Sequence, residues 1–368
     1  MKQHLWINGQ HMEANKYQEL KSPYTDELLA KVAIADQNQV RAAVDAASEA
    51  ISKMNALPAH KRADILLKTA QLLAERKEEA AVIIAKEAAK PIKTARAEVD
   101  RTVMTYTFAA EEARRLNGET ISMDAAPGGE NRTAYTVREA IGVIGAITPF
   151  NFPMNLVAHK LGPAFAAGNT VVLKPATQTP LSSYFIGELF HEAGLPEGAL
   201  NIVTGKGSEI GKHFTSDERI KALTFTGSPE VGKKLKKEAG MRKTLLELGS
   251  NSAVIVAEDA DVSKVAPRCV TGAFAYAGQV CISVQRIYVH ENVFDEFVAK
   301  AVEETKKLKL GNPLAEETDV SSLISSEDVD RAISWIEEAE NAGAQIACGG
   351  KSEDHQTVQP TILLNVSA

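Results

Sequence analysis

Cys281 is the residue whose surroundings most suggest a reactive thiol. It lies in the segment 277–283 (AGQVCIS), after an Ala-rich, helix-like run and before an expected strand. A glycine shortly before a cysteine permits a sharp turn and a close backbone approach, which can present the thiol and direct its own N–H at a substrate oxygen. The pattern predicts a nucleophile beside an oxyanion donor. A buried, inert cysteine is the alternative that composition alone favours.

Glu247 and Asn151 are two further candidates for chemistry at a carbonyl group. Glu247 stands between apolar residues in LLELG, so we expect partial desolvation, which suits a general base. Asn151 lies between two prolines in PFNFP, after an apolar strand. Prolines restrict the loop, so the amide could be held rigidly as an oxyanion donor. A paired core glutamate and a simple turn asparagine are the respective alternatives.

Three segments at strand ends could bind a phosphate or a nucleotide. The segment 205–211 (GKGSEIG) opens a helix, but its third glycine comes one residue late for G-x-G-x-x-G, so an ordinary turn explains it better on its own. Gly227 and Ser228 precede Pro229, which marks a helix start where free N–H groups attract phosphate. Lys174 ends an apolar run in LKPAT, where ligands bind in open α/β sheets, although a surface lysine is equally compatible with it.

The elements that must position these residues follow from hydrophobic periodicity. Asn8-Gly9 predicts a hairpin between 5–7 and 10–12. The chain from 37 to 116 has helical periodicity, and the turn-rich segment 118–131 indicates an arm or connector. Short apolar runs then alternate with helix-like stretches, which predicts a parallel sheet covered by helices. The expected strands are 141–147, 171–173, 200–203, 222–225, 253–256 and 286–289, and the expected late helices are 293–309 and 327–342.

Composition bounds the class of protein. The 368 residues suggest two domains at ~150 residues each, and 44% hydrophobic with 24% charged residues excludes disordered and collagen-like chains. With 41 Lys and Arg against 48 Asp and Glu, the net charge of −7 argues against a nucleic-acid partner. No apolar run suits a membrane helix, and no signal peptide is evident.

Cysteine usage points to a reducing compartment. The three cysteines are too few and too widely spaced for a disulfide framework or a metal site, so we expect a cytoplasmic protein without bound metal. Cys269, inside an expected helix, and Cys348, in an expected loop, are predicted to be structural.

Taken together, the motifs resemble the aldehyde dehydrogenase superfamily. PFNFP, NTVVLKPAT, FTGSPEVG, LELGS and GQVCISVQR occur in that order, and the similarity extends over essentially the whole chain. The resemblance implies an α/β fold with a variant Rossmann-type NAD(P)-binding domain (1–115 and 139–246), a small β oligomerisation arm (116–138) and a second α/β catalytic domain (247–368). It also implies oxidation of an aldehyde to a carboxylate by a homo-oligomer, either a dimer or a tetramer.

The resemblance assigns roles to the chemical candidates. Cys281 would form a thiohemiacetal with the aldehyde, and Asn151 with the backbone N–H of Cys281 would stabilise the oxyanion. Glu247 would be the base that activates water for hydrolysis of the thioester. Lys160, nine residues after Asn151, matches the family's supporting lysine.

For the cofactor, the resemblance implies that Lys174 holds the adenosine ribose and that Gly227 and Ser228 lie at the pyrophosphate. Strongly NAD-preferring members often carry Glu where this chain has Thr177, so NADP should be tolerated alongside NAD. The variant domain lacks the usual glycine triplet, which accounts for the spacing in 205–211. The other positions assigned to the cofactor site are Thr148, Pro149, Phe150, Ala176, Gly207, Gly211, Leu248 and Gly249.

Fewer residues bear on the identity of the substrate. The sequence around GQVCISVQR is nearest the lactaldehyde and non-phosphorylating glyceraldehyde-3-phosphate branch. Arg101 matches an arginine that some of these relatives direct at an anionic tail, and Ser283 is a second candidate contact. We therefore expect a small hydroxylated or anionic aldehyde. An arginine in helix packing is the alternative for Arg101.

Two other functions fit the same motifs. One is a coenzyme-A-acylating or semialdehyde-specific dehydrogenase of this fold, although Glu247 favours the hydrolytic branch. The other is a truncated, non-catalytic cofactor-binding or assembly module. Family members normally continue past the position of Ala368, so we expect a further C-terminal segment.

Overall fold

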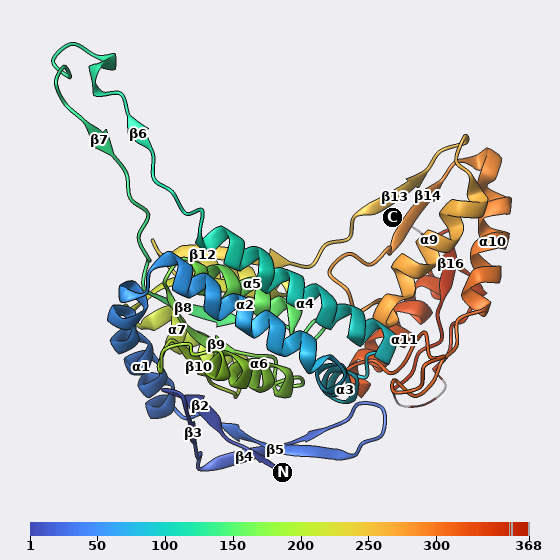
Figure 1. Ribbon diagram of the computed structural model, residues 1–368. Helices are drawn as coiled ribbons and strands as arrows, with labels where there is room; N and C mark the ends of the chain where they lie inside the picture. The colour runs from blue at the N-terminus through green and yellow to red at the C-terminus, as the bar shows by residue number, and fades with distance from the viewer. Residues whose placement is uncertain (353, 355, 367–368) are drawn as a thin grey trace.

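The computed structural model describes residues 1–352, 354 and 356–366. It has a central α/β body, a long arm that projects from the body, and a smaller lobe formed by the later part of the chain (Figure 1). The fold is the mixed α/β type that the sequence predicts.

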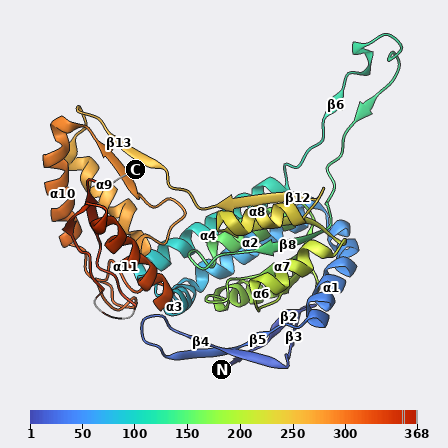
Figure 2. The ribbon, with the colours of Figure 1, turned by 180° about the vertical axis from the view of Figure 1, so that it is seen from behind.

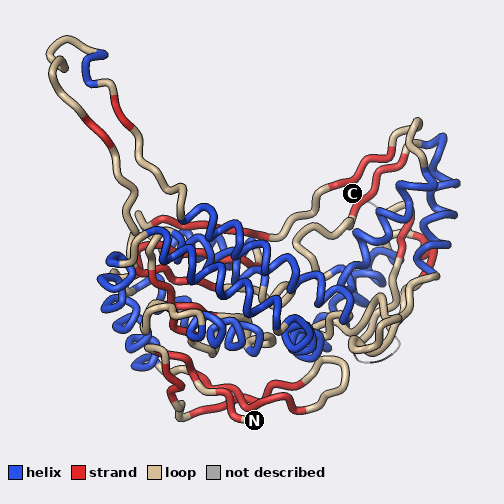
Figure 3. The backbone as a smooth tube through the Cα atoms, in the orientation of Figure 1, coloured by secondary structure: helices blue, strands red, loops and turns tan. Residues whose placement is uncertain are grey.

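The body is built on a seven-stranded sheet with the order β12-β11-β8-β9-β10-β2-β3. Its first five strands are parallel, and in chain order they run 5-4-1-2-3, which is the order of the first five strands of a doubly wound Rossmann sheet. Figure 3 distinguishes these strands from the helices around them by colour. These strands are β8 (Val143–Ile147), β9 (Thr170–Lys174), β10 (Leu200–Ile202), β11 (Ile220–Gly227) and β12 (Lys243–Leu248).

Helices cover both faces of this sheet, which is why its central strands are apolar throughout. All five residues of β9 are buried. Val171 and Leu173 belong to one core with α2–α6, whereas Val172 belongs to the opposite core with α1 and α7, as the alternation of side chains along a strand requires. The helices are α1 (Gln37–Ala56), α2 (Ala59–Glu75), α3 (Lys77–Ala88), α4 (Ile92–Ala113), α5 (Asn155–Ala166), α6 (Leu181–Glu192), α7 (Gly207–Ser216) and α8 (Pro229–Glu238).

The N-terminal hairpin extends the sheet. β2 (Leu5–Ile7) and β3 (Gln10–Met12) are joined by Asn8 and Gly9, whose φ angles of 54° and 74° confirm the predicted turn with two positive φ values. Beside it lies a three-stranded sheet with the order β1-β5-β4. Its strands are β1 (Lys2–Gln3), β4 (Lys16–Lys21) and β5 (Leu28–Ile34).

The arm leaves the body after α4 and returns before β8 (Figure 1). It contains the antiparallel pair β6 (Thr120–Ile121) and β7 (Ala134–Tyr135), with a short 3₁₀ helix, η1 (Met123–Ala125), between them. Ile121, Tyr135 and Val137 expose much of their surface there. The turn-rich sequence therefore forms an extended ribbon without a core of its own.

The smaller lobe holds the parallel pair β13 (Ala253–Val256) and β14 (Arg286–Val289), backed by helices (Figure 2). Its core includes Val256, Val262, Cys269 and Phe297. The remaining elements of the lobe are α9 (Val262–Phe274), η2 (Ala275–Gly278), η3 (Glu291–Val293), α10 (Phe294–Lys306), α11 (Ser326–Asn341), β15 (Gln345–Cys348) and β16 (Ile362–Leu364).

The first turn of α4 fastens the lobe to the body. The backbone N–H of Ile92 donates to the Pro313 carbonyl at 2.7 Å. Arg96 makes two hydrogen bonds of 2.7 Å to the carboxylate of Glu316, and Lys93 pairs with Asp319. Backbone and charged contacts thus join α4 to the 309–320 segment of the lobe.

The structure corrects two predictions about strands. β12 was not predicted as a strand. Cys348 was predicted to lie in a loop, but it is the last residue of β15, because 345–348 pairs with β16. The division into 1–115 with 139–246, 116–138 and 247–368 stays a prediction. Since β12 continues to Leu248, a boundary after 246 would divide this strand, and the 249–252 linker is the better boundary. No helix in the described ranges is long and apolar enough to span a membrane.

Candidate active site

The predicted site residues gather at the carboxyl ends of the parallel strands. Asn151 follows β8, Lys174 is the last residue of β9, Gly227 is the last residue of β11, and Glu247 is next to last in β12. The order of the strands reverses between β8 and β11, and a crevice outside such a switch point is where open α/β sheets bind ligands. From β12 the chain passes directly into the lobe that carries Cys281 (Figure 2).

Asn151 connects the body to the loop of the proposed nucleophile. Its side-chain Nδ2 donates to the carbonyl oxygen of Gln279 at 2.9 Å. An amide nitrogen carries two N–H groups, so one remains for a ligand. The Asn151 Oδ1 is buried and has no hydrogen-bond partner among the described residues. The side chain of Asn151 is therefore hydrogen-bonded to the residue that lies two positions before Cys281 in the chain.

Cys281 is exposed on the loop between η2 and β14. The preceding turn has three consecutive residues in the left-handed region, Tyr276 (φ 50°), Ala277 (φ 53°) and Gly278 (φ 76°). Such backbone is costly for residues with a side chain, and it clusters at functional sites. The Tyr276 hydroxyl donates to the Ala88 carbonyl at 2.6 Å and fastens this turn to the end of α3.

The other two thiols differ from Cys281. Cys269 is buried in α9, and burial raises the pKa of its thiol. Cys348 is half-buried, and burial raises its pKa as well. Because the thiolate is the reactive form, these two cysteines are poor nucleophiles. The alternative of a buried, inert Cys281 is wrong, because this residue is exposed to solvent.

Lys160 and Glu247 flank the end of β11. Lys160 is 6% exposed, and its ammonium donates to the hydroxyls of Thr224 at 3.1 Å and Thr226 at 2.9 Å. Burial lowers the pKa of Lys160 to about 8, and the charge of Glu247 opposes this shift. Thr226 is also the register partner of Glu247 in β12. Two threonines thus hold the lysine beside the carboxylate.

Glu247 is exposed, which corrects the expectation of partial desolvation. β12 is the edge strand of the sheet, and its burial alternates from residue to residue. The apolar neighbours of Glu247 therefore do not enclose it. Its carboxylate is free to meet water, which suits a residue that must activate a water molecule.

Lys174 shows how the residues fit a dinucleotide. It is 5% exposed and has no side-chain hydrogen bond or ion pair among the described residues. Burial lowers its pKa to about 8. A Cβ added at Gly207 would stand 3.7 Å from the Lys174 Nζ, so the ammonium lies against the first residue of α7. A buried donor without a partner is costly unless a ligand supplies the acceptor.

Two helix N-termini frame the same region. Lys206, which precedes α7, makes no side-chain cap, so the first N–H groups of that helix stay available. Ser228 accepts from the N–H of Val231 at 3.4 Å and caps α8. Helix N-termini of this kind favour phosphate. The donors and the open glycine backbone fit a dinucleotide pyrophosphate.

The remaining residues predicted for the cofactor surround these groups. The Thr148 N–H donates to the Lys174 carbonyl at 3.2 Å, and Thr177 donates to the Gly205 carbonyl at 3.5 Å. Gly211 faces Leu235 of α8, where it permits close helix packing rather than phosphate contact. Of the rest, Pro149 and Phe150 are half-buried after β8, Ala176 is buried after β9, Leu248 ends β12, and Gly249 lies beside Pro229.

The two predicted substrate contacts, Arg101 and Ser283, differ in whether their side chains are exposed and able to bind a ligand. Arg101 is exposed on α4, and its charge reaches His159. Burial first, and then the charges of Lys160 and Arg101, lower the pKa of His159. Ser283 is buried and donates to the Ala273 carbonyl at 3.0 Å, so its hydroxyl is already engaged.

A buried ion pair next to the Asn151 loop was not predicted from the sequence. Lys90 and Glu98 lie 2.5 Å apart with side chains 1% and 0% exposed. They stand in an Ala-rich stretch with several other charged residues, where the same pattern describes a solvated helix face. Pro91 directly after Lys90, which separates two helices, was the only local sign.

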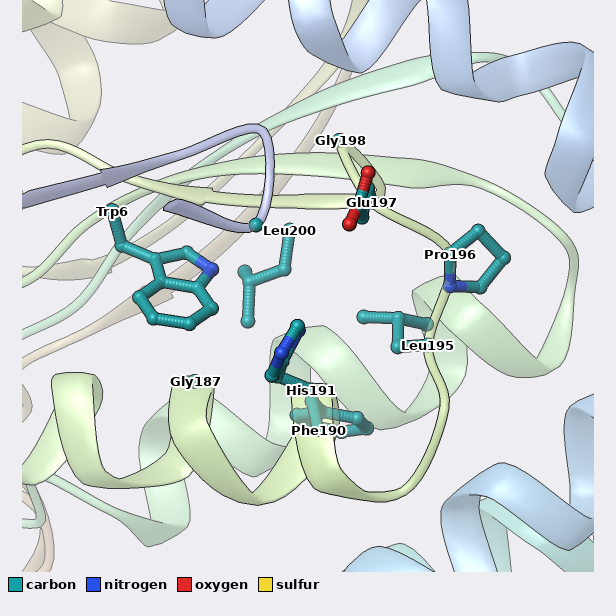
Figure 4. A pocket seen from close by; sticks show the side chains of 10 residues that line it. Trp6, Gly187, Phe190, His191, Leu195, Pro196, Glu197, Gly198 and Leu200 are labelled. Atoms are coloured by element: carbon teal, nitrogen blue, oxygen red, sulfur yellow. The ribbon is translucent and has the colours of Figure 1, made fainter. Parts of the chain in front are cut away.

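Surface pockets lie elsewhere. One small pocket lies between the β2–β3 hairpin and α6, where the rings of Trp6 and His191 meet edge to face with centroids 5.5 Å apart (Figure 4). A wider one is formed by β5, α3 and Leu181. Neither contains a predicted site residue. Among the described residues no cluster of three His, Cys, Asp or Glu side chains could hold a metal ion.

The fold and the site together define the class of protein. The sequence profile of the aldehyde dehydrogenase family matches residues 6–368. The chain belongs to this family and is an NAD(P)-dependent aldehyde dehydrogenase, which confirms the resemblance in its motifs.

Three individual proteins illustrate what the chain is similar to within the family. A 3-sulfolactaldehyde dehydrogenase of Priestia megaterium is 46% identical over 363 residues, which are 99% of this chain and 76% of the relative. A lactaldehyde dehydrogenase of Methanococcus aeolicus is 40% identical, over 98% of this chain and 76% of the relative. The NADP-dependent glyceraldehyde-3-phosphate dehydrogenase of Bacillus halodurans, solved with NADP, superimposes with a TM-score of 0.95 at 37% identity, over 99% of this chain and 76% of that one.

Proposed function

We propose that the protein oxidises a small hydroxylated or anionic aldehyde to its carboxylate through a thioester on Cys281. The observation that carries this proposal is the hydrogen bond from Asn151 to Gln279. This bond joins an amide with a spare N–H to the loop that carries the exposed Cys281, which follows the strained turn 276–278. A thiol, an oxyanion donor and a free carboxylate are the groups that this reaction needs.

The first step is addition to the aldehyde. The Cys281 thiol gives its proton to solvent, its sulfur forms a bond to the carbonyl carbon, and the π electrons of the carbonyl pass to its oxygen. Asn151 and the backbone N–H of Cys281 stabilise the resulting oxyanion, a term that is commonly worth ~10²–10³ in rate for each donor. Bound NAD or NADP would supply the acceptor for the hydride that leaves this carbon as the oxyanion re-forms a carbonyl and the thioester results.

The second step is hydrolysis of the thioester. Glu247 takes a proton from water as the water oxygen bonds to the acyl carbon. The carbon–sulfur bond then breaks, the Cys281 sulfur leaves with its electron pair, and the carboxylate is released. The exposed position of Glu247 on an edge strand supports this role, because water reaches it directly.

Either nicotinamide cofactor should serve. Lys174 would donate to the adenosine ribose, and the N-termini of α7 and α8 would receive the phosphates. Thr177 places no carboxylate against a 2′-phosphate, and the Bacillus halodurans relative was solved with NADP. We therefore infer that this chain uses NAD and tolerates NADP.

The substrate class is inferred from charge and from the relatives. Arg101 is an exposed cation whose charge acts on His159, the neighbour of Lys160. The names of the three relatives refer to hydroxy-aldehydes, two of which carry a sulfonate or a phosphate. The anionic tail of such a substrate would form an ion pair with Arg101 at the surface of the protein, so its recognition would require no buried charge.

Two further features stay proposals. The exposed apolar residues of the arm support a homo-oligomer in which the arm packs on a second copy. Three free cysteines are consistent with a reducing cytoplasm.

The proposed function is tested with two variants and three aldehydes. Cys281→Ala should abolish oxidation of lactaldehyde and of glyceraldehyde 3-phosphate, and propanal should be a poorer substrate for the unaltered enzyme than either. Glu247→Gln should keep a pre-steady-state burst of reduced cofactor and lower the steady-state rate by ~10²-fold or more. Turnover that requires coenzyme A and yields an acyl thioester would instead establish the acylating alternative.

A further inference from the structure

The buried pair of Lys90 and Glu98 lies directly beneath the loop that carries Asn151. Lys90 follows Ala89, the left-handed residue that ends α3, and Glu98 lies in the second turn of α4. Their side chains are 1% and 0% exposed, and Nζ lies 2.5 Å from Oε2. Removing two charges from water is costly, and such a pair persists only where its remaining donors and acceptors are satisfied.

Each partner makes its remaining contacts with the Asn151 loop. The Lys90 ammonium also donates to the backbone carbonyl of Asn151. The other oxygen of Glu98 accepts from the N–H groups of Met154 at 3.0 Å and Asn155 at 3.2 Å. Met154 precedes α5 and makes no side-chain cap, so Glu98 supplies the acceptor at that helix start. The pair thus holds the loop at Asn151 and at the start of α5.

Lys90 also reaches the turn that precedes Cys281. Its ammonium lies 3.8 Å from the ring centroid of Phe152 and 4.7 Å from that of Tyr276. Tyr276 is the first of the three left-handed residues, and its hydroxyl donates to Ala88, two residues before Lys90. One ammonium group therefore contacts both halves of the site, the oxyanion loop and the nucleophile turn.

We propose that Lys90 and Glu98 are positioning residues that set the Asn151 amide relative to the Cys281 thiol. This inference rests on the proposed function, because it assigns to the pair the placement of the oxyanion donor. The hydrogen bonds of the pair to the loop end on the Asn151 carbonyl and on the N–H groups of Met154 and Asn155, so we assign its effect on turnover to the Asn151 amide. A displacement of about 1 Å in such a site can cost ~10²-fold in rate.

The test replaces both charges together, because removing one would leave the other buried without a partner. In Lys90→Met/Glu98→Gln the donor to the Asn151 carbonyl is lost, while the glutamine oxygen can still accept from Met154 and Asn155. We expect kcat to fall ~10- to 100-fold with KM for the aldehyde changed less than threefold. The matched control is Asp100→Asn, which breaks the exposed pair between Lys77 of α3 and Asp100 of α4 and should leave kcat unchanged.

Combination with Asn151→Ala separates positioning from general stabilisation. If the pair acts through Asn151, the triple variant should have the kcat of Asn151→Ala alone, because the group to be positioned is already absent. Multiplicative losses in kcat would overturn the inference. Unaltered kcat in the double variant would overturn it too.

Failure of the proposed function has a different signature. Full activity in Asn151→Ala would show that this amide is not the oxyanion donor, and the positioning role would fall with it. A collapse of kcat in Asn151→Ala with multiplicative effects of the pair would overturn the inference alone. Should the double variant not fold, Lys90→Gln/Glu98→Gln offers a neutral pair whose amides can hydrogen-bond each other, with the same expected loss and the same combination test.

Discussion

The amide nitrogen of Asn151 and the carbonyl oxygen of Gln279 lie 2.9 Å apart, across a separation of 128 residues in the chain. Asn151 belongs to the body with the parallel sheet, and Gln279 belongs to the lobe with the thiol. The side chain of Gln279 accepts from the Ile324 N–H at 3.0 Å, so its own segment is held within the lobe as well. This hydrogen bond thus joins the proposed oxyanion donor to the loop of the proposed nucleophile.

Selective alkylation should identify Cys281 as the reactive thiol. It is exposed, whereas burial raises the pKa of Cys269 and Cys348. We expect iodoacetamide at neutral pH to modify Cys281 at least ~10-fold faster than the other two, as measured by peptide mass spectrometry. Loss of aldehyde oxidation should follow the same time course. Faster modification of Cys269 would contradict the assignment.

Cofactor binding should weaken as the pH rises through the pKa of Lys174. Burial lowers this pKa from 10.5 to about 8, so the ammonium starts to lose its proton near pH 8. We expect the Kd for NADP, measured by titration calorimetry, to increase from about pH 7 to about pH 10. Lys174→Met should bind weakly at every pH. An unchanged pH dependence in this variant would assign the titration to another group.

The same lysine should destabilise the protein without cofactor. Its pKa is lower in the folded than in the unfolded chain, so this penalty is complete below about pH 8 and is relieved as the pH rises toward 10.5. Lys174→Met should therefore increase the free energy of unfolding at pH 7 by about 1–3 kcal/mol. Urea unfolding measures this, with Lys206→Met as the control. A less stable Lys174→Met would refute the sign.

Thr177 should govern the choice between NAD and NADP. Thr177→Glu places a carboxylate near the 2′-phosphate of NADP, so kcat/KM for NADP should fall at least ~10-fold while that for NAD is retained. Thr177→Gln, which has a similar size and no charge, should change neither by as much. A preference of the unaltered enzyme for NAD above ~10³-fold would refute tolerance of NADP.

Arg101 should discriminate between charged and neutral aldehydes. Arg101→Met removes an exposed cation, so KM for glyceraldehyde 3-phosphate should increase ~10-fold or more. KM for lactaldehyde, which carries no anionic group, should change less than twofold. Equal effects on both substrates would indicate that Arg101 serves helix packing.

Local chemistry explains which parts of the fold were predictable. Asn8-Gly9 dictates its hairpin because both residues accept positive φ, and the run at Val171 to Leu173 is apolar because helices cover both faces of β9. β12 was missed because it is an edge strand with one open face, on which Leu245 is 53% exposed. For the same reason Glu247 is not desolvated.

The candidate site was predictable where its residues lie in short motifs. Cys281, Asn151 and Lys174 each lie within three residues of a glycine or proline in a recognisable segment, and the fold brings these segments to the carboxyl ends of the sheet strands or to the lobe that follows them. Lys90 precedes Pro91, but neither Lys90 nor Glu98 belongs to a segment whose residues suggest chemistry. Whether a charge in an Ala-rich helix faces water or a buried partner depends on tertiary packing, which periodicity in α4 does not specify.

Helix α4 carries Arg96 toward the lobe, Glu98 toward the Asn151 loop and Arg101 toward solvent at the site. For enzyme engineering this means that attachment of the lobe, support of the Asn151 loop and the proposed substrate contact all depend on one helix. One turn further along, the Thr105 hydroxyl donates to the Asn155 side chain. Substitutions that tilt α4 will therefore alter lobe attachment and turnover together. A library that seeks new aldehydes should therefore randomise the outward position 101 and leave the inward positions of α4 unchanged.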